Sequence, residues 1–298
     1  MLERKLETTA TITKERFHCN AYEVFMLKTL IKKTPFYPTL RRIYRKIKGI
    51  PRHPIQDSKT VDGFNIIHLG TEYGGWSFVD EQDLYGCTII SAGLGEDASF
   101  DVEFASKYNA KVIIVDPTPR AISHFEKIID SLGKPAIQEY SNSGCQPIDA
   151  YNLSAVTEES FTLITKALWD KNTNLKFFEP INPNHVSHSI VNYQNNYSEN
   201  TKSIEVEAVT LDSLLSDLNI NKSVVPLMKF DIEGAEIEVI KRCIDVGIMP
   251  RQILVEFDEL NVPSSKGFAR VTEVDDLLRS NGYKLLKTNG QADFLYFK

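Results

Sequence analysis

Cysteine is scarce in this sequence, and long apolar runs are missing from it. Four cysteines are scattered over 298 residues without any CxxC spacing: Cys19, Cys87, Cys145 and Cys243. This pattern favours neither a disulfide framework nor a zinc site, and it suits a reducing compartment. No stretch approaches the roughly 18 to 20 consecutive apolar residues that a membrane-spanning helix needs. The first residues also lack the apolar core of a signal peptide, so we expect a cytoplasmic protein.

Positive charge is scarce beyond the first 60 residues. Residues 1–60 carry 14 Lys and Arg against 5 Asp and Glu, whereas the whole chain has a net charge of −6. The remainder therefore carries −15, and such an acidic body is a poor partner for nucleic acid. We interpret the basic segment as an N-terminal helical extension, which ends at the Pro and Gly residues near 49–54. Packing of its apolar face on the acidic body is the simpler interpretation, and contact with an anionic membrane is the alternative.

Strand and helix patterns alternate along residues 61–298. Short apolar runs predict strands at 86–92, 111–116, 151–156, 224–231 and 252–257. Apolar residues at helical spacing lie between and after these strands, at 98–108, 122–132, 237–244 and 268–279. Asn289-Gly290, between two alternating runs, predicts a C-terminal antiparallel hairpin. The order predicts an α/β fold, with a Rossmann-like, mostly parallel sheet and helices on both faces.

The first predicted strand ends in a glycine turn, SAGLGED. Gly93 and Gly95 allow a tight turn and a close approach of the backbone to a ligand. The following helix offers free N–H groups and the positive end of its dipole to that ligand. Asp116 ends the second strand, where an acidic side chain takes the ribose hydroxyls of an adenosine. The alternative is an ordinary tight turn beside an unrelated acid.

This turn has no third glycine. A dinucleotide fold usually shows GxGxxG, and Ala98 stands in the third place here. Glu96 and Asp97 bring negative charge, which repels a pyrophosphate but suits a ligand with an ammonium and a sulfonium group. The residues therefore favour S-adenosylmethionine over NAD, with an NAD-linked or nucleotide-binding oxidoreductase as the alternative.

The strand at 224–231 ends in a cluster of charged residues. Lys229 and Asp231 are two positions apart and so face the same side of the strand. Glu233 follows in the loop, and Glu236 in the first helical turn. A hydroxyl that attacks a methyl sulfonium must lose its proton, so a carboxylate here is a candidate general base. Charge that favours the helix dipole is the alternative for the two glutamates.

A divalent metal is an alternative use of the same sheet edge. Asp231 with Glu256 or Asp258 offers hard oxygen ligands that suit Mg²⁺. We predict no metal and keep this arrangement as the second interpretation.

Residues 157–210 break the alternation of strands and helices. They are polar and rich in Asn, Ser and Thr, which predicts short strands and loops. A segment of this length inside a compact domain is usually functional, so we expect it on the substrate side of the site. His185 and His188 lie within it, and His188 is a candidate catalytic or substrate-loop residue.

Five segments, in order, resemble the FkbM family of methyltransferases: IISAGLGEDASFDVEFA, VIIVDPTPRAI, VTLDSLL, LMKFDIEGAEIEVIK and ILVEF. The resemblance covers roughly residues 62–298, and KFDIEGAE is its most diagnostic piece. It implies a methyltransferase that uses S-adenosylmethionine. The acceptor that it implies is a hydroxyl on a small molecule or sugar.

The same resemblance implies further cofactor residues. DPTP replaces a more usual Glu-Pro, so Pro117 and Thr118 join the expected site beside Asp116. Ser91 ends the first strand where methyltransferases often carry an acid, so Glu96 or Asp97 is expected to hold the methionine amine.

A third functional hypothesis is a methyltransferase-like module without catalytic activity that acts through its basic extension. The intact KFDIEGAE segment disfavours it.

Overall fold

The computed structural model describes residues 55, 61, 63–178, 203–261 and 264–298. The predicted basic extension at residues 1–60 therefore lies outside the described residues apart from Ile55, and so do His185 and His188. A search of the described part found no helix with the length and apolar character needed to cross a membrane.

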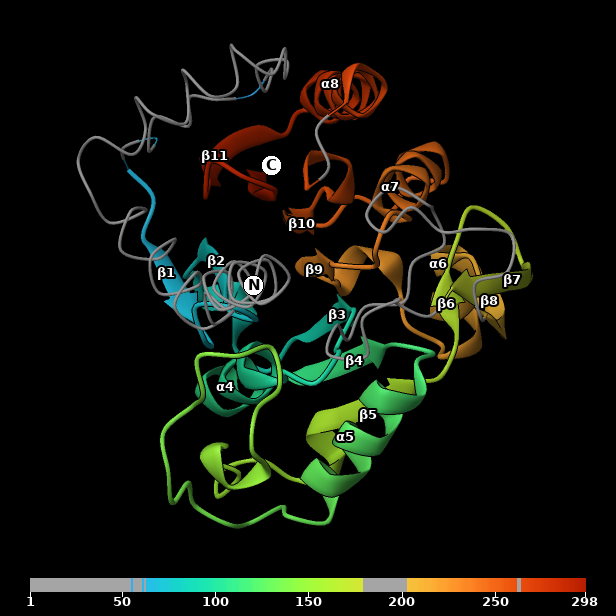
Figure 1. Ribbon diagram of the computed structural model, residues 1–298. Coiled ribbons are helices and arrows are strands. Elements are labelled where there is room, and N and C mark those ends of the chain that lie inside the picture. Colours follow the sequence, from blue (N-terminus) through green and yellow to red (C-terminus); the bar gives the residue numbers. More distant parts are fainter. Residues whose placement is uncertain (1–54, 56–60, 62, 179–202, 262–263) are drawn as a thin grey trace, which may run out of the picture. The chain divides into compact units, whose positions relative to one another are not determined.

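A central sheet of seven strands organises the described part of the chain. Its strands are β3 (Thr88–Ala92), β4 (Lys111–Val115), β5 (Phe161–Ile164), β9 (Leu227–Phe230), β10 (Gln252–Glu256), β11 (Lys284–Thr288) and β12 (Asp293–Phe297). Their order is β11-β12-β10-β9-β3-β4-β5, which Figure 1 shows from the red hairpin to the green strands. The strands from β10 to β5 are parallel, and β12 runs antiparallel to both of its neighbours. The predicted mostly parallel sheet and its C-terminal hairpin are therefore confirmed.

Helices cover both faces of this sheet. They are α4 (Ser99–Tyr108), α5 (Pro119–Ile129), α6 (Leu211–Asp217), α7 (Glu236–Asp245) and α8 (Ser265–Ser280). One buried cluster joins α4 and α5 to the sheet, and a second joins α6, α7 and α8 to it. Ile89 of β3 belongs to the first cluster and Ile90 to the second, as the two-residue period of a strand requires.

Two smaller sheets lie outside the central one. The antiparallel pair β1 (Ile66–Leu69) and β2 (Trp76–Val79) precedes it. The strands β6 (Ala167–Leu168), β7 (Thr173–Phe178) and β8 (Ser203–Val209) form a separate sheet of order β6-β8-β7. This second sheet falls within residues 157–210, where short strands were predicted. Because β5 belongs to the central sheet, the described residues of this insert depart from the α/β pattern only beyond Ile164.

The short 3-10 helices of the described chain connect these elements. They are η2 (Gln82–Leu84), η3 (Ile148–Ala150), η4 (Glu158–Ser160), η5 (Lys222–Val224) and η6 (Asp258–Leu260).

The predicted strand at residues 151–156 is wrong. Tyr151, Leu153 and Val156 are buried, but the segment forms bends and turns outside the sheet, and β5 pairs with β4 instead. The Tyr151 hydroxyl accepts a hydrogen bond from the Ala98 amide at 3.0 Å and lies 2.8 Å from His124 Nε2. Alternating burial therefore reflects packing beneath α4 and α5 rather than a place in the sheet.

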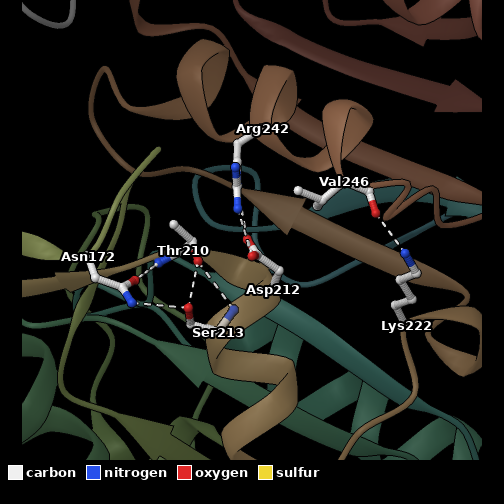
Figure 2. A network of polar contacts seen from close by, with 7 residues as sticks. All are labelled: Asn172, Thr210, Asp212, Ser213, Lys222, Arg242 and Val246. Atoms are coloured by element: carbon white, nitrogen blue, oxygen red, sulfur yellow. Dashed lines mark hydrogen bonds and ion pairs between the residues drawn. The ribbon is translucent and has the colours of Figure 1, made fainter.

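Hydrogen bonds join the small sheet to the central layers (Figure 2). Asn172, between β6 and β7, accepts from the Thr210 amide at 2.8 Å and donates to the Ser213 hydroxyl at 3.1 Å. The Thr210 hydroxyl accepts from the Ser213 amide at 3.2 Å and so caps α6. Arg242 of α7 binds both carboxylate oxygens of Asp212 in α6, at 3.1 and 2.8 Å. The start of α6 thereby connects the small sheet to α7.

Candidate active site

A cleft opens at the carboxyl ends of β3, β4 and β9. The chain leads from β3 to β4 and β5 on one side and later to β9 and β10 on the other, so the strand order reverses between β3 and β9. Ligands of open α/β sheets bind at such a reversal point. The cleft encloses about 890 Å³, including space open to solvent.

The glycine turn forms one side of this cleft. Gly93 has φ +87°, and a Cβ atom placed there would lie 1.7 Å from the carbonyl oxygen of Asp231. Only glycine lets β9 approach the turn so closely. The Gly93 amide donates to the Val115 carbonyl at 3.0 Å, and the Lys229 ammonium donates to the Gly93 carbonyl. Gly93 therefore lies locked between β4 and β9.

Asp116 lines the cleft and also braces the turn. One carboxylate oxygen accepts from the amides of Leu94 and Gly95 at 2.9 and 3.0 Å. The other accepts from the amide and the hydroxyl of Thr118 at 2.8 and 2.7 Å. The Asp116 carboxylate thus already accepts four hydrogen bonds from the protein. A ribose hydroxyl that binds it would have to replace one of these donors, such as the Thr118 hydroxyl, which can rotate away.

The two acids of the turn have different neighbours. Glu96 forms an ion pair with Arg120 of α5. Asp97 is buried and accepts from the Thr71 hydroxyl at 2.7 Å, the Ser99 amide at 3.0 Å and the Gln146 side chain at 3.0 Å. Asp97 therefore holds loops against the start of α4 while it lines the cleft.

Lys229 and Asp231 both reach the cleft from β9, as their spacing predicted. Lys229 is 3% exposed, and its ammonium lies 5.8 Å from the centre of the Trp76 ring. Trp76 is 6% exposed and packs there instead of lining the cleft. Burial raises the pKa of Asp231, the nearby Lys229 ammonium lowers it, and the Asp116 carboxylate raises it again. A carboxyl with a raised pKa is a stronger base than an exposed one once it is ionised.

The loop after β9 separates its two glutamates. Glu233 has φ +53°, a left-handed conformation that costs a non-glycine residue energy, and it lines the cleft. Glu236 is 1% exposed and does not line the cleft. Its carboxyl accepts from the Ile232 amide at 2.8 Å and from the Gly234 amide at 3.0 Å. Glu236 thus shapes the loop that presents Asp231 and Glu233.

Further acids surround the end of β10, next to Asp231. Burial and the charges of Asp231 and Asp293 raise the pKa of Glu256 to about 9. Burial raises the pKa values of Asp258 and Asp293 to about 6, although the Asn261 side chain opposes the shift at Asp258. Among the described residues, no group of three or more acids, histidines or cysteines has an arrangement that suits a metal ion. The alternative in which Asp231 and Glu256 or Asp258 share Mg²⁺ stays the second interpretation.

The structure brings most of the predicted site residues to one place. The following candidates line the cleft: Gly93, Gly95, Glu96, Asp97, Asp116, Pro117, Thr118, Lys229, Asp231 and Glu233. Ser91 lies buried below the turn, Glu236 lies behind the loop, and His188 is outside the described residues. Sequence reasoning missed Tyr73, Leu168 and Phe177, which also line the cleft. The Gly74-Gly75 pair could have indicated a close approach near Tyr73, whereas Leu168 and Phe177 carry no such signal.

Comparison with family models identifies the chain. The model described as the methyltransferase FkbM domain matches residues 84–285, which include the glycine turn, Asp116 and the KFDIEGAE segment. The chain belongs to the FkbM methyltransferase family. This FkbM chain therefore carries a methyltransferase domain, as the resemblance predicted.

Other comparisons add little about this FkbM protein. A solved structure entitled crystal structure of fibrillarin/Nop5p complex is similar over 72% of this chain and 73% of that chain, at 7% identity and a TM-score of 0.37. A likeness at that score carries no argument about fold or function. The comparison with curated proteins found no match.

Proposed function

We propose that the protein transfers a methyl group from S-adenosylmethionine to a hydroxyl on a small molecule or glycan. One observation supports this most strongly. Among the described residues, five carboxyl side chains and one ammonium, that of Lys229, line the cleft at the reversal point, and the cleft belongs to a methyltransferase domain. A cationic cofactor suits such a lining, because negative charge in a partly dry cleft attracts cations.

The cleft residues fit the parts of this cofactor. The glycine turn leaves room for a ligand close to the backbone, and Asp116 and Thr118 offer polar atoms to a ribose. Val115, Leu168 and Phe177 supply apolar surface for an adenine ring. Glu96 and Asp97 bring negative charge for the methionine ammonium.

Asp231 is the proposed general base. The bound cofactor supplies an electrophilic methyl group, and the acceptor hydroxyl must lose its proton as it attacks. Asp231 stands at the tip of β9 in the cleft, where its carboxylate can accept that proton. The Lys229 ammonium favours the ionised form of Asp231 and so opposes the effect of its burial.

An NAD-linked activity fits the cleft less well. A pyrophosphate would meet Glu96 and Asp97 at the turn, and Asp116 already occupies the amides of Leu94 and Gly95. Like charges and occupied donors both oppose its binding.

Replacement of Asp231 by Asn tests the proposed base. We expect methyl transfer from labelled S-adenosylmethionine to a panel of hydroxyl acceptors to fall by about 10²-fold or more, the usual share of a general base. Calorimetry should show almost unchanged binding of S-adenosylhomocysteine. Parallel losses of turnover and affinity would make Asp231 a cofactor ligand instead, and loss of wild-type turnover in excess chelator would restore the metal alternative.

A further inference from the structure

Tyr73 is an exposed aromatic residue of the cleft. It lies in the loop between β1 and β2, and it is 67% exposed while it lines the cleft together with Gly74 and Gly144. Aromatic side chains commonly line small-molecule sites, because the ring offers a large apolar surface to a ligand. The contacts of its loop and of its ring indicate which part of a ligand it meets.

Hydrogen bonds fix the loop that carries Tyr73. The Thr71 hydroxyl accepts from the amides of Tyr73 and Gly74 at 3.2 and 2.9 Å. The same hydroxyl donates to the carboxylate of Asp97 at 2.7 Å, and the Thr71 amide donates to the Ser99 hydroxyl at 2.9 Å. A Cβ atom at Gly74 would lie 2.6 Å from Cγ of Asp97. The backbone next to Tyr73 therefore lies directly against the Asp97 carboxylate.

The Tyr73 ring reaches a second loop at Gly144. A Cβ atom at Gly144 would lie 2.5 and 2.6 Å from the ring carbons Cε1 and Cζ of Tyr73, and 3.0 Å from its hydroxyl oxygen. The hydroxyl end of the ring therefore lies on the Gly144 backbone. The next residue, Cys145, forms a β-bridge with Glu96, and the Gln146 amide donates to the Glu96 carbonyl at 2.9 Å. This second loop is thus attached to the backbone of Glu96.

The Tyr73 ring consequently connects two loops that pack on the acids of the glycine turn. One loop lies against Asp97 and the other is attached to Glu96, and both acids line the same cleft as the ring. An aromatic ring beside carboxylates favours an ammonium group, because the face of the ring and the carboxylates both attract positive charge.

We propose that Tyr73 is a cofactor-binding residue: its ring, held on Gly144, contacts the amino-acid end of a bound S-adenosyl ligand at Glu96 and Asp97. The inference rests on the proposed function, which takes the ligand as S-adenosylmethionine with its ammonium at these acids. It assigns Tyr73 no contact with the adenosine end.

Two ligands separate the ends of the cofactor. S-adenosylhomocysteine carries the ammonium and the carboxylate, whereas methylthioadenosine has the adenosine and the sulfur without them. In calorimetry, Tyr73→Ala should raise the Kd of S-adenosylhomocysteine by about threefold or more, the value of a cation–π contact at an exposed site. It should leave the Kd of methylthioadenosine unchanged. Tyr73→Phe keeps the ring and should retain the wild-type values for both ligands.

Substitution of Gly144 tests the position of the ring. Its φ is not positive, and the three atoms nearest to an added Cβ all belong to the Tyr73 side chain. Gly144→Ala should therefore displace the ring at little cost in stability, and it should raise the Kd of S-adenosylhomocysteine as Tyr73→Ala does. In a Tyr73→Ala background the same change should have no further effect, because no ring is left to displace.

Tyr85→Ala is the matched control. Tyr85 is 52% exposed and packs on Tyr108, with ring centres 5.1 Å apart, outside the cleft. Its removal should leave the Kd values of both ligands unchanged.

The outcomes separate this inference from the proposed function. An unchanged affinity of Tyr73→Ala for S-adenosylhomocysteine, or equal losses for the two ligands, overturns the role of Tyr73 and leaves the proposed cofactor in place. A loss in Tyr73→Phe as large as that in Tyr73→Ala overturns the contact through the ring. If Tyr73→Ala does not fold, Gly144→Ala decides by the same two affinities. A wild-type protein that binds neither ligand overturns the proposed function, and the role of Tyr73 with it.

Discussion

The acidic residues of the KFDIEGAE segment have different roles, and Glu236 shows the difference most clearly. Asp231 and Glu233 face the cleft, and Glu236 turns inward to hold the amides of Ile232 and Gly234. Burial and the nearby acids Asp258 and Glu259 raise the pKa of Glu236 well above its ordinary value. Burial disfavours its charged form, and its hydrogen bonds to the two amides make it a loop anchor.

Two substitutions at Glu236 test this role. Gln has the shape of the carboxyl and keeps an acceptor oxygen for the amides of Ile232 and Gly234, so Glu236→Gln should retain stability and turnover. Glu236→Ala leaves buried amides unpaired and should lower the free energy of unfolding by about 1–3 kcal/mol. Urea denaturation and a turnover assay measure both effects. A large loss of turnover in a stable Glu236→Gln protein would instead indicate an ionised, catalytic glutamate.

The cleft residues that could be predicted best from the sequence are those at or near the end of a strand. Gly93, Asp116 and Asp231 directly follow strands and Lys229 lies near the end of β9, and the carboxyl ends of parallel strands meet at one edge. The sequence did not reveal that Asp116 is occupied by protein donors. Hydrogen-bond saturation depends on side-chain directions that residue spacing does not encode. The cofactor contacts of the individual residues stay predictions.

Among the secondary-structure elements, the small sheet is attached to α6 through Thr210. Thr210 follows β8 directly and caps α6, and its amide is bound by Asn172 from the β6–β7 connection (Figure 2). Leu168 and Phe177 of this sheet reach the cleft. The predicted substrate-side insert therefore contributes to the site through a sheet whose attachment is polar.

Removal of this cap should loosen the small sheet. Thr210→Ala is expected to cost about 1 kcal/mol, the usual value of an N-cap, and to speed amide hydrogen exchange along β8. The Ser264 hydroxyl caps α8 in the same way and accepts from the Gly267 amide at 2.9 Å, so Ser264→Ala removes the corresponding cap. This control should cost a similar amount without affecting exchange in β8. Equal exchange in the two variants would refute the coupling between cap and sheet.

The prediction of strands from the sequence failed where a buried apolar segment does not pair with the sheet. Residues 151–156 have the apolar residues of a strand, yet these residues pack under α4 and α5. Phe161–Ile164 pairs with β4 instead, although its surroundings in the sequence are polar. Helices and strands with long regular patterns, such as α7 and the C-terminal hairpin, were predicted correctly. Tertiary packing determines which of two short apolar runs joins a sheet, so the local pattern alone does not identify the strand.

At the scale of the whole molecule, buried acids at the sheet edge link stability to pH. Glu256 has a pKa of about 9 in the fold, against an ordinary value of 4.5. The folded state therefore binds a proton that the unfolded state has lost between these pH values. Stability from this group is complete below pH 4.5 and declines as the pH rises towards 9. Asp258 and Asp293, raised to about 6, act in the same direction over a narrower range.

Neutralisation of Glu256 should flatten this pH dependence. In melting experiments from pH 6 to 9, Glu256→Gln should lose less stability with rising pH than the wild-type protein. Glu273→Gln is the control, because the pKa of Glu273 is lowered by its hydrogen bond with Lys241, so it titrates below this range. A wild-type slope retained in Glu256→Gln would show that other groups carry the effect.

The proposed function requires that the cleft binds an S-adenosyl ligand. Calorimetric titration of the full chain with S-adenosylhomocysteine and, separately, with NAD tests it most directly. We predict one site of micromolar affinity for S-adenosylhomocysteine, a loss of about 1.5–3 kcal/mol of binding free energy in Asp116→Ala, and no comparable heat with NAD. Binding of NAD, or no binding of S-adenosylhomocysteine by the folded wild-type protein, would contradict the account.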